Sequence, residues 1–149
     1  MAWHGPRMKR YRVILDTNVI VAAMRSRTVA SHRLLLNICH PRWQNVVTPG
    51  LMYEYEDVAR RPNTVPNLSP EEITDILDLI YQQSHRQIVW FAWRPLSLDP
   101  GDDLVLEAAI AGGCDYVVSF NERHLRAARE FGIELLRPVE LLKLIGELE

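Results

Sequence analysis

The sequence predicts an α/β fold: a single-domain, three-layer α/β/α sandwich around a central, mostly parallel sheet of about five strands. Short apolar runs alternate with amphipathic segments along the chain, a pattern typical of strand–helix–strand crossovers that cover both faces of a parallel sheet. The length of 149 residues suits one domain. No internal repeat, low-complexity tract or linker interrupts the pattern, so we expect one continuous domain.

Five short apolar runs are expected to form the strands. The first covers residues 11–15 and is followed directly by Asp16. Polar residues, glycine or proline bound each run, as is usual for buried strands. The other four runs are Asn45–Thr48, Gln87–Phe91, Tyr116–Ser119 and Ile133–Leu136.

Helices are expected between these strands. The clearest start is Ser69-Pro70-Glu71-Glu72, where a serine cap precedes proline at the first helical position and a glutamate follows the cap by three residues. Ser31 is expected to cap another helix. The remaining helices are expected at Val19–Met24, from Pro49 to about Arg60, at Leu104–Ala111, at Asn121–Glu130 and from Pro138 onward.

Composition narrows the class of protein. Apolar residues make up 48% and charged residues 24%, as in ordinary globular domains. Cys39 and Cys114 show no metal-type spacing, which favours a reducing cytoplasm, and no apolar run reaches the ~20 residues of a membrane span. Residues 1–8 lack a signal core and are interpreted as a loose leader before a domain at 9–149. The net charge of −2 argues against a broad surface for nucleic acid but allows a local one.

Four polar side chains follow predicted strands or open the helices after them. Asp16 ends the first strand, Glu54 lies in the helix after the second, Asp103 follows the turn at residues 99–101, and Asn121 comes shortly after the fourth strand. Carboxyl ends of parallel strands share one edge, so these groups could converge. Their oxygens suit Mg²⁺ or Mn²⁺. Because such an ion relieves repulsion between carboxylates and can activate water beside a phosphate, the pattern points to phosphodiester hydrolysis.

Each of these residues also has an ordinary structural explanation. Asp16 could be only a helix N-cap, and Glu54 could belong to a charged, solvated helix face. Asp102 and Asp103 stand at a helix start, where acids meet the helix dipole favourably, and Asn121 could cap its own helix. The functional hypothesis therefore depends on their joint placement after successive strands.

Three segments of the chain resemble one family. ILDTNVIVAAMRSR, VVTPGLMYEYEDVARRP and LDPGDDLVLEAAIAGGCDYVVSFNERHL are similar to the PIN-domain nucleases, and within them to toxins of bacterial toxin–antitoxin pairs. The resemblance spans about residues 9–145. It implies a PIN-like α/β/α fold and a cytoplasmic ribonuclease that uses Mg²⁺ or Mn²⁺ to cleave single-stranded RNA, leaving a 5′-phosphate and a 3′-hydroxyl. It also implies a cognate antitoxin and a possible homodimer.

The resemblance assigns roles residue by residue. Asp16, Glu54 and Asp103 match the acids that hold the metal, and Asn121 stands where many members carry a fourth catalytic aspartate. Asparagine offers an oxygen without a charge, so a weakened module that binds RNA or protein without cutting remains an alternative. The expected supporting residues are Asn18, Ser119 and Asp102.

RNA binding requires cationic or stacking groups near the site. Arg25 and Arg27, in the loop expected after the first helix, and Arg123, just past Asn121, are the expected contacts. A different enzyme class remains open, in which Asp16 is a phosphorylated nucleophile. Phosphatases of this kind carry a second acid two residues after the nucleophile, where this chain has Asn18. Receiver domains, which are also phosphorylated on an aspartate, carry a lysine near the end of the last strand, and none is evident here.

Overall fold

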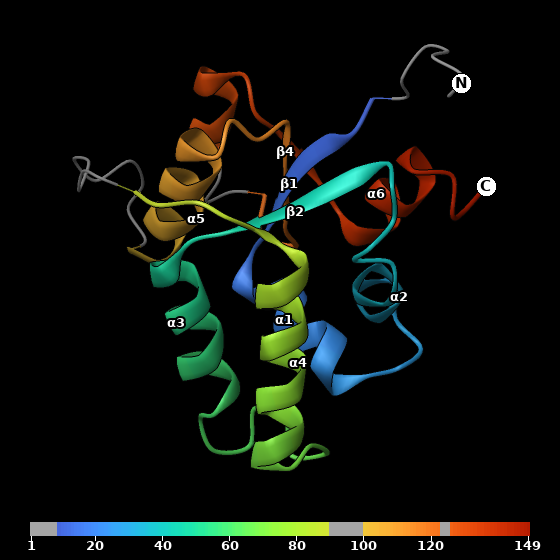
Figure 1. Ribbon diagram of the computed structural model, residues 1–149, viewed down its shortest axis with the longest axis vertical. Helices are drawn as coiled ribbons and strands as arrows, with labels where there is room; N and C mark the ends of the chain where they lie inside the picture. Colours follow the sequence, from blue (N-terminus) through green and yellow to red (C-terminus); the bar gives the residue numbers. More distant parts are fainter. Residues whose placement is uncertain (1–8, 90–99, 123–125) are drawn as a thin grey trace, which may run out of the picture.

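The computed structural model describes residues 9–89, 100–122 and 126–149, without the side chains of residues 100–103 and 126. Its centre is a sheet of five parallel strands in the order β3-β2-β1-β4-β5. Figure 1 shows this sheet between α5 on one side and α2 with α6 on the other. The strands are β1 (Tyr11–Leu15), β2 (Trp43–Val47), β3 (His85–Arg86), β4 (Tyr116–Val118) and β5 (Glu134–Leu136).

Helices connect the strands, so the predicted three-layer α/β/α fold is confirmed. Helices α3 and α4 pack against each other, and α1 contacts both α2 and α3. The helices are α1 (Thr17–Arg25), α2 (Ala30–Leu36), α3 (Pro49–Ala59), α4 (Pro70–Gln83), α5 (Pro100–Ala111) and α6 (Pro138–Leu144), with a 3₁₀ helix, η1, at Arg126–Phe131. None of the described helices is long and apolar enough to span a membrane.

The central strand is the best predicted element. β1 has the expected bounds, and its last three side chains, Val13, Ile14 and Leu15, are at most 1% exposed. A strand covered on both faces by helices is apolar along its length, which is why the apolar run marked it clearly. β2 begins two residues earlier than expected, at a completely buried Trp43.

The third strand was wrongly placed. It was predicted at Gln87–Phe91, but β3 is His85–Arg86 and pairs with β2 through Val46 and Val47; residues 90 and 91 lie outside the described part. The buried Asn45 side chain donates to the Ser84 hydroxyl at 2.7 Å, which fixes the chain just before His85. Both β3 residues are exposed at the sheet edge, so no apolar run marks them.

Four helix starts also differ from expectation. Helix α1 begins at Thr17, two residues before the expected Val19. Ser31 is not a cap: α2 begins at Ala30 behind an extended Val29, and Ser31 is buried inside the helix at 2% exposure. Helix α5 begins at Pro100, four residues before the expected Leu104. The helix predicted at 121–130 is the 3₁₀ helix η1 instead; residues 121 and 122 are not helical, and 123–125 lie outside the described part.

The predicted start of α4 is confirmed in detail. The Ser69 hydroxyl accepts a hydrogen bond from the Glu72 N–H at 3.1 Å, and the Glu72 carboxylate accepts one from the Ser69 N–H at 3.0 Å. The hydrogen bond from the Ser69 N–H lowers the pKa of Glu72, since it favours the charged form of the carboxylate. The reciprocal pair satisfies two backbone donors that the helix itself leaves unpaired.

We expect the Ser69→Ala variant to lower the free energy of unfolding by about 1 kcal/mol, because it removes a helix cap. Urea unfolding followed by circular dichroism measures this difference. The Ser69→Asp variant keeps an acceptor oxygen and should retain the wild-type stability within a few tenths of a kcal/mol. Equal stability of the alanine variant and the wild type would show that this cap does not stabilise the fold.

Candidate active site

Asp16 occupies the carboxyl end of the central strand. Its N–H donates to the Val118 carbonyl at 2.9 Å, which continues the pairing of β1 with β4. Its side chain is only 8% exposed and caps α1: Oδ1 accepts a hydrogen bond from the Thr17 N–H at 2.7 Å. The Ser119 hydroxyl donates to Oδ2 at 2.6 Å. The N-cap explanation is thus correct, but it uses only one of the two carboxylate oxygens.

The strand order explains why Asp16 and Ser119 meet. From β1 the chain proceeds outward through β2 and β3, and then returns to place β4 and β5 on the other side of β1. In open parallel sheets, ligands bind beyond the carboxyl ends of the strands where the order reverses in this way. Asp16 follows β1 and Ser119 follows β4, so their hydrogen bond lies across this reversal point.

Ser119 is held in turn by two neighbours. Its hydroxyl oxygen accepts hydrogen bonds from the Asn121 N–H at 2.9 Å and the Asn18 side-chain amide at 3.3 Å. The Asn18 amide oxygen accepts a longer bond from the Phe120 N–H at 3.4 Å. Two donors on the Ser119 oxygen leave its own proton directed at Asp16. The expected supporting residues Asn18 and Ser119 therefore lie together beside Asp16.

Glu54 reaches the same place from α3. Its side chain is half-buried, and Oε2 accepts a hydrogen bond from the Thr17 hydroxyl at 2.6 Å. Thr17 itself is 9% exposed. Because the Thr17 N–H also binds Asp16, both carboxylates meet at the first residue of α1. Two of the three acids predicted as ligands are thus brought together by a residue between them.

Tyr55 joins α3 to the end of β1 directly beside the two acids. It is completely buried, and its hydroxyl donates to the Leu15 carbonyl. Burial raises the pKa of Tyr55 well above its ordinary value of 10.0, and the negative charges of Asp16 and Glu54 raise it further. Both carboxylates thus act on the same phenol, in agreement with their shared contact with Thr17.

The other predicted site residues fall into two groups. Asp102 and Asp103 lie in the first turn of α5, with side chains outside the described part, and Arg123 is also outside it. Arg25 ends the nine-residue helix α1 and Arg27 lies just beyond it; both are exposed, and Arg25 is roughly 13 Å along the helix axis from Asp16. The structure therefore does not bring these two arginines to the carboxylates.

Oxygen donors of this kind fit a hard divalent cation. Asp16 and Glu54 are carboxylates, and one carboxylate can accept about four hydrogen bonds or ligand contacts. In the described part of the chain, no group of three His, Cys, Asp or Glu side chains is placed to hold a metal. The two described acids thus supply part of a ligand set, to which Asp103 was predicted to contribute the rest.

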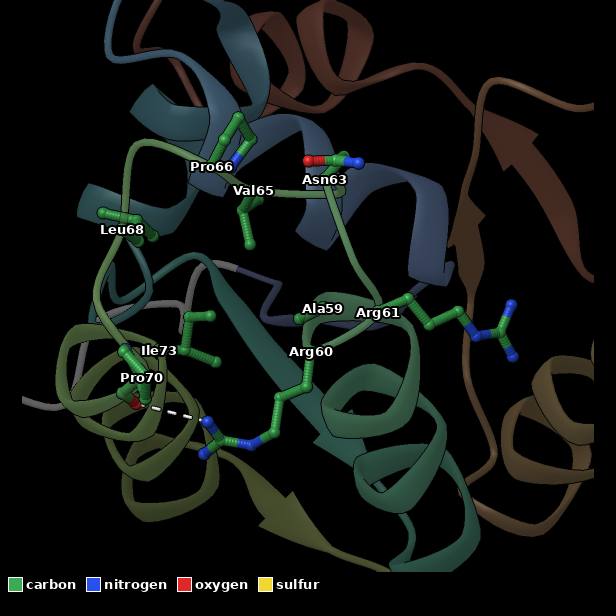
Figure 2. A pocket seen from close by; sticks show the side chains of 9 residues that line it. All are labelled: Ala59, Arg60, Arg61, Asn63, Val65, Pro66, Leu68, Pro70 and Ile73. Carbon is green, nitrogen blue, oxygen red and sulfur yellow. Dashed lines mark hydrogen bonds between the residues drawn. The ribbon is translucent and has the colours of Figure 1, made fainter.

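A separate cavity of about 370 Å³ lies at the other end of α3. Figure 2 shows Val65 and Ile73 among its walls, while Arg60 turns toward α4 and donates to the Pro70 carbonyl at 3.2 Å. Arg61 is paired with Asp57 at 2.8 Å. The cavity lining is mainly apolar and holds no carboxylate, so its chemistry differs from that of the site around Asp16.

Residues 12–123 match the family model for the PIN domain. The chain belongs to the PIN-domain family. The fold of this PIN domain is similar to a chain in the crystal structure of VapBC2 from Rickettsia felis bound to a DNA fragment from their promoter, with a TM-score of 0.56 and 13% identity. That match covers 85% of this chain and 98% of the other, and at this identity it shows the fold alone. No curated protein matches this chain.

Two residues of the site were not predicted from the sequence. The sequence assigned no role in the site to Thr17 or to Tyr55. A weak signal for Tyr55 exists: it lies four residues after Leu51 on the buried face of α3, and a buried tyrosine needs a partner for its hydroxyl. The bond between Thr17 and Glu54 spans 37 residues and has no local signal.

We expect the Tyr55→Phe variant to lower the free energy of unfolding by about 1–3 kcal/mol, because the buried Leu15 carbonyl loses a hydrogen-bond donor. The neighbouring Tyr53 is 73% exposed, so the Tyr53→Phe control should change stability by less than about 0.5 kcal/mol. Urea unfolding at pH 7 measures both. Equal effects of the two substitutions would contradict the assigned role of the Tyr55 hydroxyl.

The same variant tests the electrostatics of the site. Since the pKa of Tyr55 is raised in the folded protein, its contribution to stability is complete below pH 10 and is lost as the pH rises toward the folded-state pKa. Between pH 9 and pH 11 the wild type should therefore lose more stability than Tyr55→Phe. Parallel stability curves for the two proteins would contradict a raised pKa for Tyr55 in the folded protein.

Proposed function

We propose that this PIN domain is a metal-dependent endoribonuclease that hydrolyses phosphodiesters of single-stranded RNA. The observation that carries the proposal is the meeting of Asp16 and Glu54 at Thr17, on the edge of the sheet where the strand order reverses. Membership of the family supports nuclease chemistry, and paired carboxylates at such an edge suit a hard cation and an anionic substrate.

Asp16, Glu54 and Asp103 would hold Mg²⁺ or Mn²⁺, and the Asn121 amide oxygen would assist through water. When bound, the divalent cation would supply positive charge that activates water and binds a phosphate oxygen. The protein's own groups keep the carboxylates in place: Ser119 and the Thr17 N–H hold Asp16, and the Thr17 hydroxyl holds Glu54. Without a cation, two acids this close repel each other.

We propose that arginine side chains bind the RNA at two separate places on the protein. Arg123 follows Asn121 by two residues in the sequence and is the proposed contact nearest the reaction. Arg25 at the last position of α1 and Arg27 just beyond it lie away from the carboxylates, so we propose that they bind phosphates of a more distant part of the RNA strand. Such contacts are salt-dependent and independent of base sequence.

We further propose that the protein is a cytoplasmic toxin neutralised by an antitoxin protein. The similar solved structure is described as VapBC2 with DNA from its promoter, and the similarity places the two folds in one structural class. A partner that inhibits the site would complement its acidic groups, for example with a basic side chain directed at Asp16 and Glu54. A homodimer of the toxin is part of the same proposal.

A second candidate function is a binding module that retains the fold without cleavage. Asn121 favours it, because this position would otherwise add a fourth carboxylate to the cation site. The two functions differ in one measurable property. A module binds RNA with no new 5′-phosphate ends in the presence of Mn²⁺, whereas a nuclease produces such ends and stops when a chelator is added.

Asp16→Asn should reduce cleavage of a defined single-stranded RNA by at least about a hundredfold, since changes around metal ligands alone cost 10–100-fold. The fold should persist, because asparagine caps helices as well as aspartate does. Gel analysis of end-labelled RNA with Mn²⁺, and with chelator as control, measures the loss. Wild-type cleavage by a purified D16N protein with an unchanged melting temperature would remove Asp16 from the mechanism.

A further inference from the structure

We infer that Thr17 is a positioning residue that holds both described carboxylates of the site, and that its hydroxyl sets the affinity for the divalent cation. The inference rests on the proposed function, because it takes Asp16 and Glu54 as ligands of one cation. It assigns to Thr17 a role beyond capping. The Thr17 N–H binds Asp16 Oδ1 at 2.7 Å, and the Thr17 hydroxyl binds Glu54 Oε2 at 2.6 Å.

The position of Thr17 makes this double contact possible. It is the first residue of α1, so its N–H has no partner within the helix and is available to Asp16. The hydroxyl of a threonine deep in a helix can bond back to a carbonyl three or four residues earlier. At the first helical position no such helical carbonyl precedes it, and the hydroxyl is directed to α3 instead.

Because Thr17 is buried, its hydrogen bond to Glu54 restricts the conformation of the Glu54 side chain. Thr17 is only 9% exposed and is β-branched, so its hydroxyl has few alternative directions. Glu54 is half-buried on the flank of α3, where a long carboxylate side chain has several rotamers. A hydrogen bond from a fixed donor selects one of these rotamers. The cation then meets a Glu54 that is already placed beside Asp16.

The contact leaves both acids able to bind a cation. The hydroxyl uses one acceptor position on Glu54 Oε2, and a carboxylate has about four. A hydroxyl donor also brings no positive charge to the site, whereas a lysine or arginine in the place of Thr17 would compete with the cation. Partners of metal ligands that orient them in this way typically change metal affinity 10–100-fold when they are removed.

Tyr55 and Thr17 act on different parts of the same arrangement. Tyr55 joins the backbone of β1 to α3 through the Leu15 carbonyl and so fixes the distance between the two elements. Thr17 acts on the side chains that project from those elements. Loss of the Tyr55 hydroxyl should therefore lower mainly the free energy of unfolding, whereas loss of the Thr17 hydroxyl should lower mainly the affinity for the cation.

Titration of the full-length, metal-free protein with Mn²⁺, followed by isothermal calorimetry, tests the inference. Thr17→Val keeps the shape and the N–H but removes the hydroxyl, and we expect its dissociation constant for Mn²⁺ to rise about 10–100-fold. Thr17→Ser restores a hydroxyl and should restore the affinity. Thr28→Val removes an exposed hydroxyl beyond the other end of α1 and should leave the affinity unchanged.

The outcomes separate the inference from the function on which it rests. Wild-type Mn²⁺ affinity in a folded Thr17→Val protein overturns the inference, as does a loss that Thr17→Ser does not restore. If Thr17→Val does not fold, Thr17→Ala makes the same comparison with a smaller side chain. Mn²⁺ binding that depends on Thr17 in a protein that does not cleave RNA overturns the proposed nuclease alone. A wild type that binds no Mn²⁺ overturns both.

Discussion

The site is organised around a single constraint, the burial of the Asp16 carboxylate at the end of the central strand. A buried charge is costly unless hydrogen bonds or opposite charge compensate it. Here the compensation includes a backbone N–H at a helix start and the Ser119 hydroxyl. Ser119 is itself fixed by Asn18 and the Asn121 N–H. The contacts from β4 and α1 thus converge on one carboxylate, which explains why polar residues gather at this otherwise apolar part of the sheet.

The second carboxylate turns this arrangement into a candidate reaction centre. An N-cap needs one acid, and a second acid beside it adds repulsion without improving the cap. The fold nevertheless joins Glu54 and Asp16 through hydrogen bonds to the same residue, Thr17. In addition to the effect of burial, the negative charges of both acids raise the pKa of the buried Tyr55 phenol. This repulsion is the physical reason for the cation proposed above. The far end of the molecule, with its mainly apolar cavity and paired arginines, shows no comparable conflict.

The sequence predicted what depends on local pattern and missed what depends on contacts between distant segments. β1 and the start of α4 were placed correctly, because burial on both faces and a capping box leave clear signals. β3 was misplaced because its register follows from Asn45 and Ser84, 39 residues apart. Likewise, Asp16 and Glu54 could be nominated from their places after strands, but Thr17 could not, since its contact with Glu54 exists only after α1 and α3 have packed.

The most direct test of the account is the position of a bound cation. Crystals of the protein grown with saturating Mn²⁺ and measured at a wavelength where manganese scatters anomalously would reveal it. The account predicts an anomalous peak within about 2.5 Å of carboxylate oxygens of both Asp16 and Glu54. Occupied manganese elsewhere, with these two carboxylates bearing no metal, would contradict the central claim that they are ligands of one ion.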